Sequence, residues 1–336
     1  MLKNIKRGLV GAFFVFMLFF AFLNLPGPKP REDVVLGMTF STRYAEGLGL
    51  DWKETYIALL DDMGIKKWRL PAYWDIIERE RGQYDFSELD WLLAETQKRD
   101  GEVILSVGQR VPRWPECHIP LWAKEDEELR KSALLKMIRT TVERYKDNPT
   151  VTTWQVENEP FLAIFGICPK FDPDFLTTEV ALVHALDPSR QVIVTDSGEL
   201  SVWYKAAREG DIFGTTLYRD IYQKRFGYVT YPIGPYFFKM KELWVRLLTD
   251  QENFMVIELQ AEPWANGWVG TVPLEEQFIT MNEKKLVENV TYARRVGFHD
   301  IYLWGGEWWY WLKVKKDYPA LWETGKTLFA QYGTEK

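Results

Sequence analysis

The chain alternates short apolar runs with longer stretches in which apolar residues recur at helical spacing. A run of about four to eight apolar residues favours a buried strand, whereas recurrence every three or four residues favours an amphipathic helix. This pattern predicts eight strands, at residues 34–41, 67–70, 102–107, 151–156, 191–195, 212–217, 254–259 and 299–304. Helices are predicted between and after them, at residues 51–63, 86–98, 126–145, 177–186, 203–208, 238–248, 282–296 and 321–332.

The ends of two predicted helices carry recognisable signals. Asp51 and Glu54 form a capping box at the start of the first helix, and Asn148-Pro149 stops the helix predicted to end at residue 145. Eight successive strand–helix units predict a single α/β domain folded as a (β/α)8 TIM barrel. The alternative is a doubly wound sheet, but no Gly-x-Gly-x-x-Gly turn follows the first strand.

The first 25 residues differ from the rest of the chain. An apolar run extends over residues 9–25, interrupted only by Gly11 and Asn24. Its length is close to that of the shortest helix that crosses a bilayer, roughly 17 residues. We therefore predict a membrane anchor at residues 1–25, a Pro-rich linker at 26–32 and the barrel domain at 33–336.

Basic residues before the run, Lys3, Lys6 and Arg7, indicate that the barrel faces away from the cytoplasm. A cleaved signal peptide is the alternative, and it would make the protein secreted. The run ends in Leu-Asn-Leu-Pro-Gly-Pro, without the small residues that precede a cleavage site. We therefore favour the uncleaved anchor.

Composition narrows the range of functions. The formal net charge is −6, but residues 1–31 hold five basic residues and no acid, so the remainder carries 37 basic against 48 acidic residues. An acidic globular part argues against nucleic acid as a partner. Three histidines and two cysteines are present, without a Cys-x-x-Cys or His-Glu-x-x-His motif, so we expect no metal and no organic cofactor.

Two glutamates follow apolar strand residues, where a barrel carries its chemistry. Glu159 lies in Asn158-Glu159-Pro160 after the fourth predicted strand, and Glu258 follows three apolar residues in the seventh. Strands four and seven lie across the barrel from each other, so both carboxylates can face one cleft at the carboxyl ends. Burial raises the pKa of a carboxyl group, which suits a general acid. Glycoside hydrolases use two carboxyl groups that flank the scissile bond.

With these motifs the chain resembles the retaining (β/α)8 glycoside hydrolases of clan A, which include the family 5 cellulases and mannanases. The resemblance extends along most of residues 34–312. Residues 68–74 and 77–86 look like that clan's second strand and following loop. Asn158-Glu159-Pro160 matches its acid/base motif, and Glu258 matches its nucleophile.

The resemblance implies a role for each of these residues. Glu159 would be the acid/base, and Glu258 would be the nucleophile. Asn158 would hydrogen-bond the sugar 2-hydroxyl. Arg69 would support the nucleophile, and Tyr218, which ends the sixth strand, would hydrogen-bond it.

Aromatic residues are abundant, with 16 Trp, 16 Tyr and 20 Phe. Flat rings stack on the apolar faces of sugars. By the resemblance, Trp304 at the end of the eighth strand would form the floor of the subsite for the reacting sugar. Trp264, after the seventh strand, and Trp308, after the eighth, are further candidates for substrate binding. The alternative is that such rings pack beneath the loops.

Glu262 competes with Glu258 for the role of nucleophile. It lies in Gln260-Ala261-Glu262-Pro263, beyond the apolar part of the seventh strand. We prefer Glu258, because it follows the apolar residues directly, and we expect Glu262 to bind a sugar hydroxyl.

Two cysteines follow neighbouring strands. Cys117 comes after the third strand and Cys168 after the fourth. On an outward-facing domain these loops could be joined by a disulfide. Two buried free thiols are the alternative.

These features predict a retaining glycoside hydrolase that cleaves a β-linked oligo- or polysaccharide through a covalent glycosyl-enzyme. The expected partners are a carbohydrate and the membrane, and we expect a monomer. Two alternatives stay open: a transglycosylase on the same scaffold, and a non-catalytic membrane-anchored glycan-binding protein. A barrel that has lost its catalytic activity tends to lose one of the two catalytic carboxylates, whereas Glu159 and Glu258 are both present here.

Overall fold

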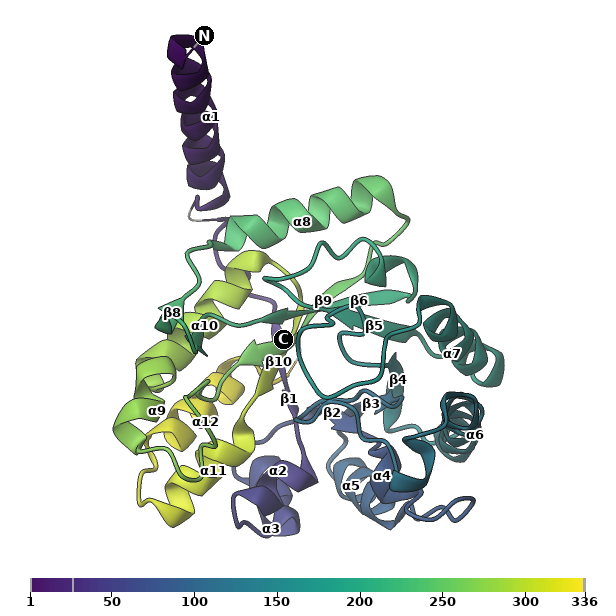
Figure 1. Ribbon diagram of the computed structural model, residues 1–336. Coiled ribbons are helices and arrows are strands. Elements are labelled where there is room, and N and C mark those ends of the chain that lie inside the picture. Colours follow the sequence, from purple (N-terminus) through teal and green to yellow (C-terminus); the bar gives the residue numbers. More distant parts are fainter. Residues whose placement is uncertain (1, 26, 335–336) are drawn as a thin grey trace.

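The computed structural model describes residues 2–25 and 27–334, and its centre is a closed barrel of eight parallel strands (Figure 1). The strands follow one another around the barrel in chain order, and the last pairs with the first. The predicted TIM barrel is confirmed, and the strands predicted at residues 102–107, 151–156 and 212–217 keep their bounds. The barrel strands are β1 (Val35–Thr39), β2 (Lys67–Pro71), β3 (Glu102–Val107), β4 (Val151–Val156), β5 (Val192–Asp196), β6 (Ile212–Leu217), β9 (Phe254–Gln260) and β10 (Asp300–Trp304).

Apolar side chains fill the inside of the barrel, and a larger core lies between the strands and the helices. The inner cluster consists of Ile104, Ile193, Met255, Ile257 and Tyr302. Val103 and Leu105 belong to the outer core, as the alternation of strand side chains requires. Gly37 makes room for the inner cluster, since a Cβ there would lie 2.5 Å from the Tyr302 ring. The barrel is therefore a packed core, and chemistry has to take place at its ends.

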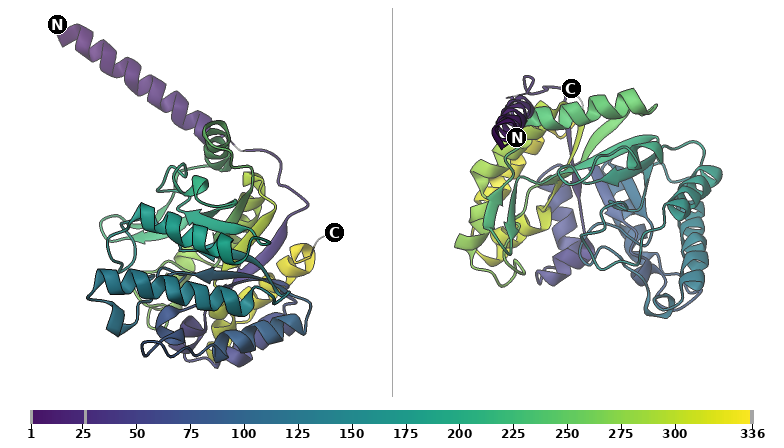
Figure 2. Two further views of the ribbon diagram at one scale, coloured as in Figure 1. Left: turned by 90° about the vertical axis from the view of Figure 1, so that its right-hand side faces the viewer. Right: turned by 45° about the horizontal axis from the view of Figure 1, so that its top comes forward.

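Helices surround the barrel (Figures 1 and 2). Asp51 caps the first of them by accepting the backbone N–H groups of Lys53 and Glu54. One helix begins four residues earlier than predicted, because Asp172 caps it and Pro173 suits its first turn. The helix predicted at residues 203–208 is only a short 3-10 turn, η2 (Ala206–Arg208). The surrounding helices are α3 (Trp52–Asp61), α5 (Ser87–Gln97), α6 (Glu127–Tyr145), α7 (Pro173–Leu186), α8 (Pro235–Leu248), α10 (Glu283–Val296) and α12 (Ala320–Tyr332).

Several short elements that the periodicity did not predict lie in the connections that leave the carboxyl ends of the strands. They build the rim around the end of the barrel at which active sites of this fold are found. They are α2 (Thr42–Gly47), α4 (Trp74–Ile77), η1 (Leu121–Ala123), the hairpin of β7 (Asp220–Gln223) and β8 (Gly227–Thr230), α9 (Leu274–Thr280) and α11 (Gly306–Lys315).

The segment after β10 is a helix, α11, and this overturns one prediction. Its residues from Gly306 to Leu312 are all buried, so this part of the helix is covered on every side. Trp308 is fully buried, and its indole N–H donates to Gln277 Oε1 (2.7 Å). The neighbouring Trp309 donates to the backbone oxygen of Ala261 (2.7 Å). The prediction that Trp308 binds substrate is therefore wrong, because the ring is part of the core.

Helix α1 (Leu2–Leu23) projects from the barrel beside α8 (Figures 1 and 2). Residues Lys6–Leu23 are long and apolar enough to cross a membrane, and none of them is buried. A signal sequence has the same properties, so membrane anchoring stays a prediction. Residue 1 of the predicted anchor, residue 26 of the predicted linker and residues 335–336 of the predicted barrel domain lie outside the described residues.

We expect Trp308→Ala to lower the free energy of unfolding by about 3–5 kcal/mol, because it empties a fully buried site. Equilibrium denaturation in urea measures the change. Trp114→Ala removes a tryptophan that is 62% exposed and is the matched control, with an expected change below about 0.5 kcal/mol. Weaker carbohydrate binding by Trp308→Ala at unchanged stability would contradict the core position of this ring.

Candidate active site

An irregularity in β9 turns Glu258 toward the inside of the barrel. Val256 pairs with Thr215 of β6, and the next paired residue is Glu258, opposite Thr216. Ile257 is thus an extra residue, and the register toward β10 shifts at the same place. A bulge of this kind re-aims side chains. Ile257 packs inside the barrel, and Glu258, directly after it, is buried against charged and polar groups.

Arg69 of β2 is fully buried, and its guanidinium binds partners on two other strands. Nη1 donates to Glu258 Oε1 (2.6 Å), and Nη2 donates to the side-chain oxygen of Asn158 (2.6 Å). Nε donates to Gln155 Oε1 (2.7 Å). The other Glu258 oxygen accepts from the Tyr218 hydroxyl (3.0 Å). All four predicted site residues in this group therefore meet in one hydrogen-bonded network.

Glu159 follows β4 and lies beside β6. Its backbone N–H donates to Thr195 Oγ1 (2.8 Å), and its carboxyl Oε1 accepts from Thr216 Oγ1 (3.0 Å). Thr216 is also the register partner of Glu258, so the two glutamates adjoin the same threonine. Glu157 and Glu159 have φ of 56° and 44°, a left-handed conformation that costs on the order of 1–3 kcal/mol per residue. The strained turn aims the Glu159 carboxyl into the site.

The environment of Glu159 favours its protonated form. Burial raises the pKa of this carboxyl well above its usual value, and the negative charges of Glu258 and Glu116 raise it further. Glu159 therefore keeps its proton to a higher pH than an exposed glutamate does.

Glu116, in the loop after β3, is a third carboxyl in the site and was missed in the sequence. Burial and the charge of Glu258 raise its pKa to about 7. Its Oε2 accepts from the Asn158 amide (3.1 Å) and lies 3.9 Å from Nε of Arg110. Its position after a predicted strand was the only signal in the sequence, and many residues share that signal.

Arg113, from the same loop as Glu116, contacts both Glu262 and Trp304, and the three side chains form a second cluster in the site. Its guanidinium lies between two rings, 3.6 Å from the centroid of Tyr44 and 3.8 Å from that of Trp304. It pairs with Glu262 (2.5 Å) and with the fully buried Glu307 (3.3 Å). The Trp304 indole N–H also donates to Glu262 (2.8 Å). Glu262 thus binds the Arg113 guanidinium and the Trp304 indole, and Arg113 covers one face of the Trp304 ring.

A row of aromatic rings runs outward from the nucleophile candidate. Tyr218, which binds Glu258, meets Trp264 edge to face at 5.1 Å between ring centroids. Trp264 lies 5.5 Å from Phe165, and Phe165 lies 5.9 Å from Trp114, the exposed end of the row. Trp264 therefore lies where it was predicted, whereas the two outer rings were not singled out.

The predicted disulfide between Cys117 and Cys168 is confirmed, with Cα atoms 5.2 Å apart. It joins the loop that carries Glu116 to the loop that follows Glu159. The two loops are also joined by hydrogen bonds from the Gln109 and Arg110 backbone to Glu157 (2.8 Å each). The third and fourth loops therefore form one unit beside the carboxyl group of Glu159.

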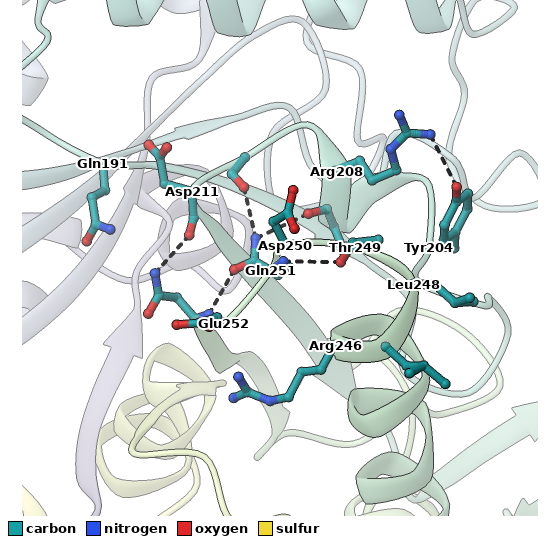
Figure 3. A pocket seen from close by; sticks show the side chains of 14 residues that line it. Gln191, Tyr204, Arg208, Asp211, Arg246, Leu248, Thr249, Asp250, Gln251 and Glu252 are labelled. Carbon is teal, nitrogen blue, oxygen red and sulfur yellow. Dashed lines mark hydrogen bonds between the residues drawn. The ribbon is translucent and has the colours of Figure 1, made fainter.

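A polar hollow at the opposite end of the barrel carries no comparable chemistry (Figure 3). It is lined by residues that precede strands, among them Gln191, Asp211 and Asn253. Its polar groups bind one another: the Gln251 amide donates to the backbone oxygen of Gly210 (2.9 Å) and its oxygen accepts from the Asn253 N–H (2.8 Å). Among the described residues, no group of three or more His, Cys, Asp or Glu side chains is arranged to hold a metal ion.

The sequence matches no protein-family model and no curated protein sequence. Solved structures match its fold. A β-galactosidase from the haloarchaeon Halorubrum lacusprofundi aligns over 80% of this chain and 52% of its own, with 15% identity and a TM-score of 0.54. A family 5 mannosidase from Rhizomucor miehei aligns over 83% of this chain and 82% of its own, with 15% identity and a TM-score of 0.53.

Endo-glycoceramidase II from Rhodococcus sp. aligns over 82% of this chain and 74% of its own, with 15% identity and a TM-score of 0.52. This chain spans only about half the length of the β-galactosidase from Halorubrum lacusprofundi (52%) and of a β-galactosidase from Marinomonas ef1 (54%). At such identities the likeness shows a shared (β/α)8 fold, and the chemistry has to be argued from the residues of this chain.

We expect Arg69→Gln to lower the free energy of unfolding by about 3–5 kcal/mol at neutral pH, because it leaves the Glu258 carboxylate buried without its cation. Glu258→Gln should also destabilise the protein, since it leaves the Arg69 guanidinium buried without its carboxylate partner. The double variant should be clearly more stable than the sum of the two losses predicts. Denaturant unfolding of all four proteins measures this coupling. Strictly additive losses would contradict a direct ion pair.

Proposed function

We propose that this protein is a retaining glycoside hydrolase that cleaves a β-linked oligo- or polysaccharide. One observation carries the proposal: two buried glutamates, Glu159 after β4 and Glu258 in β9, adjoin the same residue of β6 in opposite electrostatic settings. Burial favours the proton on Glu159, whereas Arg69 pairs with the carboxylate of Glu258. A retaining mechanism needs one protonated carboxyl group as the acid and one ionised carboxylate as the nucleophile.

In the first step, a Glu258 oxygen attacks the anomeric carbon while the bond from that carbon to the leaving oxygen breaks. Glu159 transfers its proton to the departing oxygen, so the products are a free alcohol and a sugar bound to Glu258 as an ester. Arg69 and Tyr218 hold the two oxygens of Glu258 in position for the attack. Asn158, already oriented by Arg69, is the candidate for binding the sugar 2-hydroxyl.

In the second step, Glu159 is ionised and takes a proton from water. The water oxygen attacks the anomeric carbon, and Glu258 leaves as a carboxylate that Arg69 again pairs with. Two displacements at the same carbon give net retention of configuration. Both glutamates then stand in their starting protonation states.

The surroundings of the pair favour a substrate of more than one sugar unit. The rings of Trp264, Phe165 and Trp114 continue outward from Tyr218 and offer flat surfaces for successive sugars. Trp304 is 8% exposed, and Arg113 covers one face of its ring, so a reacting sugar would use the other face. The fold neighbours whose names specify a linkage are β-galactosidases and a β-1,4-mannosidase, which supports a β-linked substrate.

We also propose that α1 anchors the enzyme in a membrane with the barrel outside the cytoplasm. Residues Lys6–Leu23 expose their apolar side chains on every side, and Lys6 and Arg7 stand at the end of the run that would remain in the cytoplasm. The disulfide between Cys117 and Cys168 is in keeping with an oxidising compartment.

The full chain in detergent should release sugar from a member of a panel of β-glycans and aryl β-glycosides. Glu258→Gln should abolish release from every substrate. Glu159→Gln should lower kcat/KM by roughly 10²–10⁴-fold on natural glycans but much less on dinitrophenyl glycosides, whose leaving group needs no proton. Product anomers followed by NMR should show retention.

Three other outcomes would contradict parts of this proposal. Inversion, or activity that survives Glu258→Gln and disappears in Glu262→Gln, would contradict Glu258 as the nucleophile. Transfer of the sugar to a second sugar in place of water would identify a transglycosylase that uses the same two carboxyl groups. Glycan binding without turnover would favour a non-catalytic binding protein.

The dependence of kcat/KM on pH should shift in Glu116→Gln. At high pH kcat/KM falls because Glu159 loses its proton. The negative charge of an ionised Glu116 opposes that loss by raising the pKa of Glu159. Removing this negative charge lowers the pKa of Glu159, so the basic limb should move to lower pH. Glu288→Gln, an exposed glutamate on α10, is the control and should leave the limb in place. A limb that moves to higher pH in Glu116→Gln would contradict this electrostatic role.

A further inference from the structure

We propose that α8 lies in the headgroup region of the same bilayer that α1 crosses, so that the side of the barrel rests on the lipid surface. This inference rests on the membrane anchoring proposed above. It does not depend on the reaction that the barrel catalyses.

Helix α8 exposes a concentrated apolar surface. The exposed fraction is 57% for Trp244 and 77% for Leu247, and Leu243 and Leu248 are about half exposed. Each of the other described helices that surround the barrel exposes at most one large hydrophobic side chain, such as Val287 on α10. Scattered apolar side chains are normal on a surface, but a contiguous patch marks an interaction site.

The exposed apolar residues lie on one stripe with two half-buried ones, Tyr236 and Met240. Tyr236, Met240, Leu243, Trp244 and Leu247 are separated by three, four or one residue, which places them on one face. The opposite face packs on the barrel through Phe238, Glu242 and Val245. The helix is therefore amphipathic, with an inner face that the fold uses and an outer face that it does not.

The charges beside the stripe suit a lipid boundary. Lys239 and Arg246 both pair with the buried Glu242, at 2.5 and 2.9 Å. One carboxylate thus compensates one of the two positive charges within the helix. The long stems of both residues can extend to the headgroups while the apolar stripe enters the interface. A helix with this pattern, with Trp on its apolar face, lies in the plane of a membrane surface.

The position of α8 identifies lipid as the occupant of this face. The last turn of α1 contacts the first turn of α8, where the Phe22 ring meets the Tyr236 ring edge to face at 5.1 Å. Figures 1 and 2 show that α8 starts beside the base of α1 and extends away from it, at a steep angle to the α1 axis. A bilayer crossed by α1 therefore has its surface at the level of α8.

This placement orients the enzyme. Helix α8 begins after the loops at the carboxyl end of β6 and ends before β9, so it runs along the side of the barrel, opposite to the strands. With α8 on the lipid surface, the barrel axis lies along the membrane and the site of Glu159 and Glu258 opens sideways. Glycans held close to the membrane are the substrates that this orientation favours.

Single cysteines introduced into the full chain can test the proposal, because both native cysteines form the disulfide. Leu247→Cys on α8, Val15→Cys on α1 and Leu121→Cys on η1 are spin-labelled and placed in phosphatidylcholine vesicles. Leu121 is 82% exposed and is the matched control for Leu247. Collision rates with oxygen, which enters lipid, and with a nickel chelate, which stays in water, report the surroundings of each label.

We expect positions 15 and 247 to be reached mainly by oxygen and position 121 mainly by the nickel chelate. Position 247 in water with position 15 in lipid would overturn the proposal and leave the anchor standing. Both positions in water would overturn the anchor as well. Spin–spin broadening at position 247 that disappears on dilution with unlabelled protein would show that a second copy covers α8, which also overturns the proposal.

Discussion

The buried guanidinium of Arg69 is the interaction on which the rest of the site depends. A charge without access to water has to be paired and hydrogen-bonded, or the fold loses several kcal/mol. Arg69 meets this requirement by binding Gln155 and Asn158 at the end of β4 and Glu258 in β9. These strands are therefore held in one relative position, and the orientation of Glu258 follows from the need to neutralise the arginine.

The excess of carboxyl groups over cations in the site favours the protonated forms of two of them, Glu116 and Glu159. Glu116, Glu159 and Glu258 share a buried region: the charge of Glu258 raises the pKa of both other carboxyls, and the charge of Glu116 raises that of Glu159 further. Of these three carboxyl groups Arg69 pairs directly with Glu258, whereas burial favours the protonated form of Glu159. The same physics that stabilises the folded site thus prepares two carboxyl groups for opposite roles in the proposed reaction.

How far the sequence predicted this structure differs between the barrel and its rim. The positions of the barrel strands and of most helices follow from the spacing of apolar residues, a signal carried by neighbours two to four positions apart. All eight barrel strands were found in this way, whereas β7 and β8 were not. Helix α11 was missed because its residues from Gly306 to Leu312 are buried on every side, so that no polar face reveals the helical period. For the same reason Trp308 was mistaken for a sugar-binding ring.

The sequence by itself determined the barrel, the strand ends that carry Glu159 and Glu258, and the apolar helix at the N-terminus. The tertiary structure decided which charged groups share a site, because Arg69 and Glu258 are 189 residues apart and no local pattern links them. Glu116 and Arg113 acquired their importance in the same way, through burial beside groups from distant strands. The exposed stripe on α8 also became visible only when packing showed which face of the helix the barrel leaves uncovered.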